Sequence, residues 1–449
     1  MSHQLHRRQL LRMGGVGLLA GAFSSVLNRT AYAQVIGQPV LINFRKVLII
    51  FQRGANCGLN TIIPHGNSSE YFGYRPLPTL SGPGVDNIGV PFDPAFDLNG
   101  FASMHPAMAP LSHVFNQGHL AFLHRVGTID YSRSHFEAQR YYETLSPTTP
   151  AGSLALEEGW VARMVGALPT TGGYAGVSVS NAFQQAFRST DPSRVQWHVP
   201  NIAAYSQAKV KGAPTAVEAK MFGSAGLAAQ YGGAQVVTET SALAYRSGVE
   251  MQEADAALSG VSSAQPNTPY PATPFGASLR DAVSMLTQTN ALVAGVEIGG
   301  WDTHAFQGGV NGRQAELLNE LALGLRAVYN NVMAHGGSQD LMVLVVTEFG
   351  RTTPQTGSFG TDHGHGGVAM AMGLRVNGGV YNCDPSTWLP GDMTGPDGPW
   401  VHHRTDFRAV FKEILRAYYF ANTSMIDLVI PGWSSLSGPT FAELGFVKP

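Results

Sequence analysis

Two histidines and an aspartate stand close together in a glycine-rich stretch, GTDHGHGG, at residues 360–367. The glycines permit tight turns and close backbone approach, and they disfavour a helix or a central strand. Neighbouring imidazoles and a carboxylate in such a loop are typical of groups that share a cation. We therefore take Asp362, His363 and His365 as candidate metal ligands. Their spacing does not decide whether His363 or His365 binds directly.

Residues of the same chemical types occur elsewhere in the chain. Asp302 and His304 lie in the stretch GGWDTHAFQ, and Glu348 and Arg351 follow a strongly apolar run. Each has a structural alternative, because Asp302 could cap a turn and Glu348 could pair with Arg351. Taken together, these carboxylates and imidazoles favour a divalent metal ion. Zinc (Zn²⁺) is the first choice, and manganese, iron or copper are alternatives.

A serine and an arginine precede a helix that is expected at residues 136–145. Ser134 would stand at the helix N-terminus, where backbone N–H groups and the helix dipole favour anions. With a metal ion nearby, its hydroxyl could attack a phosphate or sulfate ester, and Arg133 could hold the oxyanion. The alternative for Ser134 is an ordinary helix cap.

Strands and helices alternate along the chain and would position these residues. Apolar runs and helical patterns predict strands at 47–51, 119–126, 291–298 and 341–347, and helices at 136–145, 278–290 and 313–334. This alternation predicts an α/β fold, with a doubly wound, mainly parallel sheet and helices on both faces. Because ligands bind beyond the carboxyl ends of parallel strands, the candidate residues would meet at one rim of the sheet.

The segment from about 200 to 276 departs from this alternation. It contains an Ala-rich, helix-compatible stretch and ends in the proline-rich sequence SSAQPNTPYPATPFG, which favours extended or turn geometry. We interpret it as a helical or irregular insertion within one α/β domain that spans residues 34–449.

Residues 1–33 have the pattern of an export signal peptide. Arg7 and Arg8 precede a weakly apolar, glycine-containing stretch, and an A-x-A cleavage motif follows at residues 31–33. Paired arginines are typical of signals for the twin-arginine translocation machinery, which exports folded proteins. The expected location is therefore periplasmic or secreted, in the bacterial cell envelope. The alternative is a plain amphipathic N-terminal helix.

Composition narrows the class of partner. Charged residues make up 13% of the chain, the formal net charge is −2, and no basic cluster follows the signal, so nucleic acid is not an expected partner. No later apolar run reaches the roughly 18 residues that span a bilayer, so no transmembrane segment is expected. The expected partner is a small anionic or ester substrate.

The two cysteines, Cys57 and Cys383, leave several alternatives open. In an oxidising compartment they could form a disulfide bond. Cys57 could instead be a structural thiol, a thiolate ligand of a borderline metal ion, or a catalytic thiol.

Four other histidines lie in apolar or helical surroundings and are expected to be structural: His105, His113, His119 and His124. The adjacent pair His402 and His403 is left unassigned.

Six stretches, in order along the chain, resemble the exported bacterial family called domain of unknown function 1501: RGANCGLNTIIP, LHRVGTIDYSRSHFEAQ, GGWDTHAFQ, VVTEFGRTTP, GTDHGHGGVAMAMG and TDFRAVFKEIL. By fold similarity, that family is grouped with the alkaline phosphatase and sulfatase superfamily. The resemblance implies a doubly wound sheet, one or two divalent metal ions at the strand ends, and a Ser, Thr or formylglycine nucleophile at a helix start. Carried over by position, it implies that Ser134 stands in the nucleophile's place. Asp302 and His304, with His363 or His365, would then form one metal site.

The same resemblance implies that Glu348 faces a second metal ion, but the chain departs from the family pattern there. The family usually reads RGGNDGL where this chain reads RGANCGL, so Cys57 replaces a carboxylate. Phe349 also stands where phosphatases often have a histidine. Both departures weaken the two-metal interpretation.

The leading functional hypothesis is an exported metal-dependent hydrolase of phosphate or sulfate esters or a related anionic substrate. In this hypothesis the metal ion polarises the ester oxygen, Ser134 attacks, and Arg133 or Arg351 balances the developing charge. Two alternatives stay open. One is a non-catalytic envelope binding protein that retains the fold, and the other is a copper redox protein in which Cys57 and histidines hold the ion.

Overall fold

A mixed sheet forms the centre of the protein. The computed structural model describes residues 45–79, 86–129, 131–146, 158–168, 175–190, 196–199, 201–202, 266–334, 341–420 and 422–448. The strands of this sheet are β1 (Lys46–Arg53), β4 (Leu120–Gly127), β5 (Gly176–Ser178), β6 (Trp197–His198), β7 (Val293–Gly299), β8 (Leu341–Thr347), β9 (Gly367–Met372), β10 (Gly379–Tyr381) and β11 (Thr405–Asp406). Their order is β10-β4-β9-β8-β1-β7-β5-β6, and β11 also pairs with β4. A separate two-stranded sheet joins β2 (Ile62–Ile63) to β3 (Ser103–Met104).

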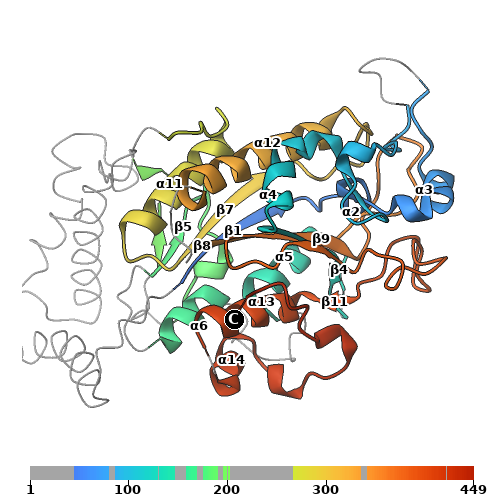
Figure 1. Ribbon diagram of the computed structural model, residues 1–449. Helices are drawn as coiled ribbons and strands as arrows, with labels where there is room; N and C mark the ends of the chain where they lie inside the picture. The colour runs from blue at the N-terminus through green and yellow to red at the C-terminus, as the bar shows by residue number, and fades with distance from the viewer. Residues whose placement is uncertain are drawn as a thin grey trace, which may run out of the picture.

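Helices cover both faces of the large sheet (Figure 1). One face carries α4 (Ser112–Asn116), α11 (Pro274–Gln288) and α12 (Arg313–Val328), and the other carries α5 (His135–Thr144), α6 (Trp160–Ala167), α13 (Phe407–Tyr418) and α14 (Thr423–Val429). Alternate side chains of β1 enter the two cores: Leu48 and Ile50 belong to one cluster, and Val47, Ile49 and Phe51 to the other. The uninterrupted apolar run of β1 is therefore what a doubly covered strand requires. The predicted α/β fold is confirmed.

The expected elements are present with small shifts at their ends. The four predicted strands are β1, β4, β7 and β8, and the three predicted helices are α5, α11 and α12. The helix expected to reach residue 334 changes to a π-helix over Tyr329–Met333. Helix α5 begins one residue earlier than expected, so His135 is its first residue. Two short helices, α2 (Gly58–Thr61) and α3 (Ser68–Tyr74), follow β1.

Strand β9 was not predicted and runs against the rest of the sheet. It is antiparallel to β4 and β8, whereas all other pairings in this sheet are parallel. Because β8 ends and β9 begins at the same edge, the connection over residues 348–366 starts and finishes where β1, β4 and β7 also end. We call this edge the rim. The glycine-rich stretch that holds His363 and His365 lies there.

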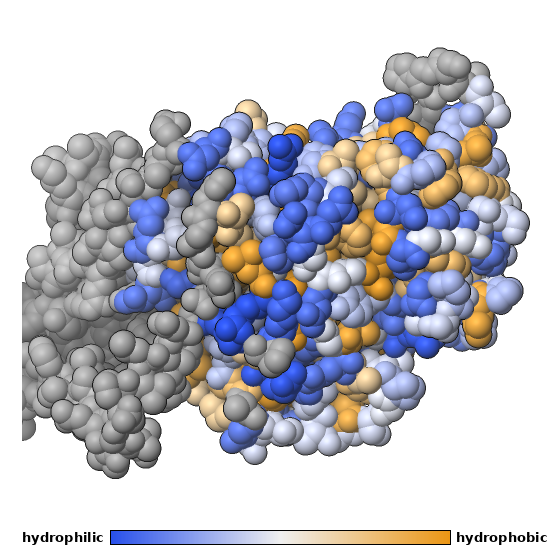
Figure 2. Space-filling view, in the orientation of Figure 1, coloured by the Kyte–Doolittle hydropathy of each residue, from blue (hydrophilic) through white to orange (hydrophobic). Residues whose placement is uncertain are grey.

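Two sequence predictions concern residues outside the described ranges. These are the export signal at 1–33 and most of the insertion at about 200–276. Within the described ranges, every helix is too short or too polar to cross a membrane. On the face shown in Figure 2, hydrophilic residues are interleaved with small groups of hydrophobic ones.

Candidate metal centre

Three imidazoles and a carboxylate meet at the rim. His135 begins α5 after strand β4, Asp302 and His304 follow β7, and His363 lies in the connection between β8 and β9. Because these strand ends face the same edge, residues as far as 228 positions apart become neighbours. We call His135, Asp302, His304 and His363 the rim cluster.

The donor atoms of the rim cluster converge on one point. Oδ1 of Asp302 lies 3.0 Å from Nε2 of His304 and 3.3 Å from Nε2 of both other histidines. Nε2 of His363 is 3.0 Å from Nε2 of His135 and 3.0 Å from Nε2 of His304. In tetrahedral zinc coordination, with bonds of about 2.0–2.1 Å, neighbouring ligand atoms lie about 3.3 Å apart. The five distances above, 3.0–3.3 Å, are close to this spacing. Two overlapping triads of described side chains could hold a metal ion here: His135, Asp302 and His363, and His304, Asp362 and His363.

The opposite ring nitrogens of two rim histidines donate to acceptors. Nδ1–H of His135 donates to Oε1 of Glu348 at 2.8 Å, and Nδ1–H of His363 donates to the backbone carbonyl of Arg133 at 2.7 Å. Metal-binding histidines commonly have such a partner, because it fixes the tautomer that leaves a lone pair on Nε2. The rings are therefore oriented with their Nε2 atoms toward the centre of the cluster.

Hydrogen bonds alone do not account for the contacts at the centre. Nδ1 of His304 lies 3.5 Å from Oδ1 of Asp362, so this ring also turns Nε2 inward. Oδ1 of Asp302 meets three imidazole nitrogens within 3.3 Å and Nη2 of Arg351 at 2.6 Å. When both rings are neutral and donate through Nδ1–H, the Nε2 lone pairs of His135 and His363 lie 3.0 Å apart and cannot hydrogen-bond to each other. A cation between these nitrogens and Oδ1 of Asp302 would bind both lone pairs.

Glu348 is buried behind the cluster and orients His135. Its Oε1 accepts hydrogen bonds from Nδ1 of His135, Nε2 of Gln139 and the backbone N–H of Gly54, each at 2.8 Å. Burial alone would raise the pKa of Glu348, but these hydrogen bonds outweigh it and lower the pKa below its ordinary value. The hydrogen bond to Glu348 also raises the pKa of His135. Glu348 therefore supports a ligand and does not stand among the converging atoms.

Arg351 holds the carboxylate of Asp302 in its ionised form. The Arg351 side chain is fully buried, whereas the Asp302 side chain is 44% exposed. Burial would raise the pKa of Asp302, but the charge and hydrogen bond of Arg351 outweigh it and lower that pKa. The carboxylate is thus negative and open to a cation from the solvent side.

Two glycines let the rim segments approach each other. Gly54 has a φ of +113°, and a Cβ there would lie 2.6 Å from the backbone nitrogen of Asp302. A Cβ at Gly360 would lie 2.3 Å from the carbonyl carbon of His304. Only glycine fits at either position without moving the ligand-bearing segment after β7.

A comparison with family profiles identifies the relatives of the chain. The profile described as "Protein of unknown function (DUF1501)" matches residues 44–384. The chain belongs to the DUF1501 family. The matched residues include the whole rim cluster and five of the six motifs, and the sixth, TDFRAVFKEIL at residues 405–415, lies beyond the matched range. No curated protein and no solved structure matches the chain. The relation to alkaline phosphatases and sulfatases stays a prediction.

His135 is a candidate ligand of this DUF1501 chain; its sequence places it in the turn after a predicted strand but did not assign it to the metal site. The sequence drew attention to its neighbours Ser134 and Arg133 instead. The available signal was the position of His135 directly after them, in a turn that follows a buried strand. Its ring enters the cluster because α5 begins at this residue.

Ser134 and Arg133 are exposed beside the rim cluster. Ser134 is the N-cap residue of α5, but its side chain makes no capping hydrogen bond. The guanidinium of Arg133 lies 5.1 Å from the ring centroid of Trp400. The structure places both residues next to His135, and their catalytic roles stay predictions.

The two cysteines of this DUF1501 chain are buried free thiols, so they form no disulfide bond in this structure. Sγ of Cys57 accepts a hydrogen bond from Nη1 of Arg75 at 2.9 Å. Cys57 belongs to none of the groups of described side chains that could hold a metal ion. Its surroundings are those of a structural thiol.

His365 lies apart from the rim cluster, although it is two residues from His363. Its Nε2–H donates to the backbone carbonyl of Thr128 at 2.8 Å. Burial lowers the pKa of His365 to about 3. It forms a separate group with His402 and His403. The two histidines of the glycine-rich stretch therefore belong to different groups.

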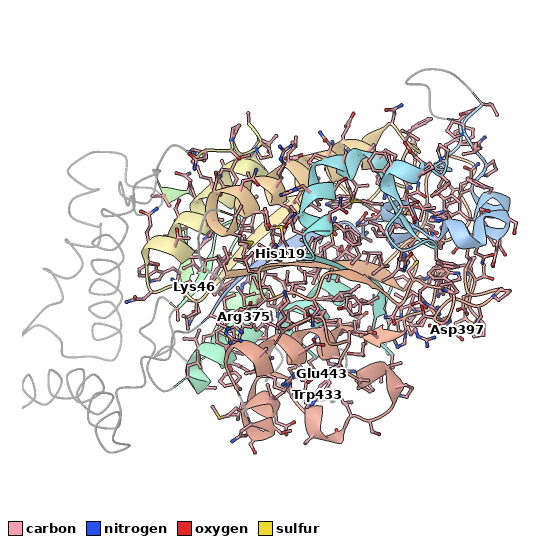
Figure 3. The ribbon with its side chains drawn as sticks, viewed as in Figure 1. Lys46, His119, Arg375, Asp397, Trp433 and Glu443 are labelled. Carbon is pink, nitrogen blue, oxygen red and sulfur yellow. The ribbon has the colours of Figure 1, made fainter. Side chains whose placement is uncertain are left out.

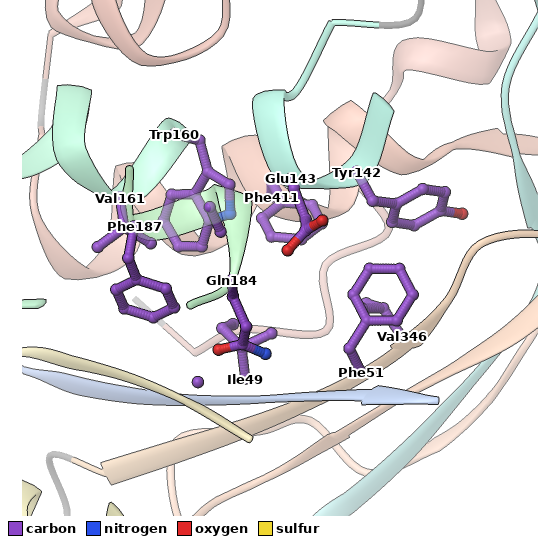
Figure 4. Close-up of a pocket in the computed structure, with 12 residues that line it drawn as sticks. Ile49, Phe51, Tyr142, Glu143, Trp160, Val161, Gln184, Phe187, Val346 and Phe411 are labelled. Carbon is purple, nitrogen blue, oxygen red and sulfur yellow. The ribbon is translucent and has the colours of Figure 1, made fainter. Parts of the chain in front are cut away.

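The enclosed cavity in Figure 4 is not part of the rim. Its volume is about 20 Å³, room for one water molecule. It lies between Ile49 and Phe51 of β1 and the aromatic rings of Trp160 and Phe411 (Figure 4). No rim-cluster residue lines it. This cavity is therefore separate from the rim cluster.

Proposed function

We propose that the rim cluster binds one divalent metal ion, and that the protein is a metal-dependent hydrolase of phosphate or sulfate esters or a related anionic substrate. The observation that carries this proposal is the convergence of three imidazole Nε2 atoms on Oδ1 of Asp302 within 3.3 Å. Imidazole and carboxylate donors suit zinc first, with manganese, iron or copper as alternatives. A divalent ion there would polarise an ester oxygen and stabilise the negative charge that develops on it.

Solvent exposure supports a site that a substrate can reach. The side chains of Asp302 and His304 are 44% and 46% exposed. Structural zinc sites are typically closed by protein ligands, whereas catalytic sites keep one position for water or substrate. This exposure favours a hydrolase over the alternative of an envelope binding protein with a structural metal.

The start of α5 supports an anionic substrate. This helix has ten residues, and its first residue is the ligand candidate His135. An anion beside the cluster would meet the positive end of the helix dipole and the exposed guanidinium of Arg133. Ser134 is the proposed nucleophile, because its exposed hydroxyl caps no backbone N–H.

Arg351 has a positioning role in this proposal. Its buried guanidinium contacts Oδ1 of Asp302 at 2.6 Å, so it fixes a metal ligand and does not touch the substrate. The copper redox alternative needs a thiolate beside imidazoles. Among the described side chains, Cys57 joins no such group, so nothing supports that alternative.

From the sequence of residues 1–33, we also propose export by the twin-arginine machinery to the periplasm or the cell exterior. The rim cluster is assembled from folded segments, which suits a route that exports folded proteins.

Metal content and ester hydrolysis test the proposed function together. Elemental analysis of the purified mature protein should show bound metal, which the double variant His304→Ala/His363→Ala should lose. His119→Gln is the matched control, because His119 precedes β4 at the end of the sheet opposite the rim. The substrates are nitrophenyl phosphate, bis-nitrophenyl phosphate and nitrophenyl sulfate, each with added zinc or manganese.

Hydrolysis that needs metal and disappears in the double variant, but not in His119→Gln, would support the proposal. A folded, metal-free wild type that takes up no added metal would contradict the metal site. A metal-loaded protein that hydrolyses none of the three esters would contradict the hydrolase and favour the envelope binding protein.

A further inference from the structure

A second group of histidines lies near the rim cluster and shares no member with it. His365 comes from the connection between β8 and β9, and His402 and His403 come from the segment just before β11. Ring nitrogens from all three lie within 4.8 Å of one another. We call these three residues the imidazole cluster. Because β9 and β11 both pair with β4, the two segments meet near the end of that strand.

His365 has an unused acceptor in the protein interior. The residue is only 2% exposed. Its Nε2–H donates to the carbonyl of Thr128, so the lone pair is on Nδ1. Nδ1 is buried and has no hydrogen-bond partner in the described part of the chain. A buried polar atom without a partner is destabilising, so this nitrogen calls for a ligand.

The two other rings also carry unpaired nitrogens. Both ring nitrogens of His403 are buried without a hydrogen-bond partner among the described residues. Nε2 of His402 lies 3.1 Å from Oδ2 of Asp397, but it too is buried and makes no hydrogen bond in the described part of the chain. In the view of Figure 3, Asp397 lies at the opposite end of the molecule from Lys46, which begins β1. The imidazole cluster is thus on the rim side of the sheet.

Glycines leave the space that these rings occupy. A Cβ at Gly127, the last residue of β4, would lie 2.8 Å from Cβ of His403 and 3.2 Å from Nε2 of His365. A Cβ at Gly395 would lie 1.7 Å from Cδ2 of His402. Any larger residue at either position would displace an imidazole.

Ordinary packing does not explain this arrangement. His105 shows how a structural histidine is satisfied: its Nδ1 accepts from the backbone N–H of Ala107, and its Nε2–H donates to the carbonyl of Gly309. In the imidazole cluster, by contrast, Nδ1 of His365 and both ring nitrogens of His403 are left over. His124 also has a buried Nδ1 without a partner among the described residues. The imidazole cluster differs from it because one ring nitrogen from each of its three residues lies within 4.8 Å of the other two, so that one cation fits all three.

We propose that the imidazole cluster is a second metal site, which binds a borderline transition-metal ion, zinc being the first choice, through three imidazole nitrogens. Imidazole suits zinc, copper and nickel, whereas magnesium and calcium prefer oxygen ligands. A bound ion would join the connection between β8 and β9 to the segment before β11. This site is independent of the rim cluster and of the proposed hydrolase activity.

Zinc stoichiometry of the full mature chain tests the proposal. Metal-free protein is dialysed against zinc, and bound zinc is counted by elemental analysis. We expect two zinc ions for the wild type, one for His403→Gln, one for His304→Ala and none for the combined variant. His119→Gln should keep both ions. Because His304→Ala reports on the rim cluster alone, failure of the proposed function and failure of this second site are distinguishable.

Wild-type stoichiometry in His403→Gln would overturn the second site. A wild type that binds a single ion and loses it in His304→Ala would do the same. Circular dichroism and thermal unfolding of the metal-free proteins show whether His403→Gln folds. If it does not fold, Gly127→Ala replaces it, since that variant keeps all three histidines. Weaker binding of one of the two ions is then expected, and unchanged zinc binding would overturn the proposal.

Discussion

Histidines at the rim and histidines in the interior are held in different ways. At the rim, His135 and His363 turn their Nε2 atoms toward each other at 3.0 Å and give Nδ1–H to an acceptor. In the interior, His105 and His124 stand alone, and each gives Nε2 to a backbone carbonyl. The same side chain thus serves as a converging donor in one region and as a single hydrogen-bonded group in the other.

The difference shows which observations identify a metal site. Burial lowers the pKa of His105 to about 4 and that of His124 to about 3, so both are neutral in the folded protein near neutral pH. The hydrogen bond to Glu348 instead raises the pKa of His135. Burial alone therefore does not identify a metal site, whereas the convergence of ring nitrogens from several histidines does.

The variant His363→Ala should have the largest effect, because it leaves the rim without a converging set of metal ligands. Nε2 of His363 contacts the donor atoms of His135, His304 and Asp302, so its loss removes the shared member of the cluster. We expect zinc affinity at the rim to fall by more than about 100-fold and metal-dependent hydrolysis to be lost. Calorimetric zinc titration measures this, with His105→Gln as the interior control. Equal zinc affinity in His363→Ala and His105→Gln would contradict the assignment of the rim histidines as metal ligands and of the interior histidines as structural.

Glu348→Gln sharpens the comparison by changing a supporting contact and no ligand. The amide has the shape of the carboxylate but no charge, so His135 loses a charge-assisted hydrogen bond. We expect zinc affinity to fall by about 10–100-fold with the fold retained. Glu143→Gln is the matched control, because Glu143 is also buried but pairs with Arg53 and not with an imidazole. Similar losses in both variants would point to general destabilisation.

The buried histidine His105 should make the free energy of unfolding depend on pH under acidic conditions. Between about pH 6.5 and about pH 4, His105 is protonated in the unfolded chain but neutral in the folded chain. The free energy of unfolding therefore decreases as the pH falls through this range. For this one group the loss is about 2 kcal/mol at about pH 5. Denaturant unfolding of metal-free protein across this range measures it, and His105→Gln should flatten the dependence. A slope unchanged by this variant would contradict the interior assignment.

Cys57→Ala should have the smallest effect and no effect on metal content. The thiol accepts a hydrogen bond from the buried Arg75, so we expect a loss of about 1 kcal/mol in the free energy of unfolding. Urea unfolding and elemental analysis of the same sample measure both quantities. A loss of bound metal would instead make Cys57 a ligand and extend the rim cluster.

Much of the fold followed from the sequence because β1 and β8 are covered on both faces, which requires uninterrupted apolar runs. The meeting of distant residues at the rim followed from the parallel arrangement of the strands. Strand β9 was not predicted, because its sequence GVAMAM is rich in alanine and methionine and poor in β-branched residues.

The choice of ligand within each motif could not be predicted. Moving a helix start by one residue turns a side chain by about 100°, so whether His135 or Ser134 faces the rim depends on where α5 begins. The separation of His363 from His365 depends on contacts with Arg133 and Thr128, which lie on another strand connection. The grouping of His402 and His403 with His365 could not be predicted, because it depends on the pairing of β11 with β4.

The antiparallel strand β9 also bears on when during protein synthesis a metal ion can be bound. It lies between β8 and β4, and the connection that leads to it carries His363, made 228 residues after His135. Contacts over such a span form late, because the chain between them must first be ordered. A growing chain therefore lacks a complete rim cluster until most of its sheet has formed. Metal uptake is expected to be a late step of maturation, after chain synthesis has passed β9.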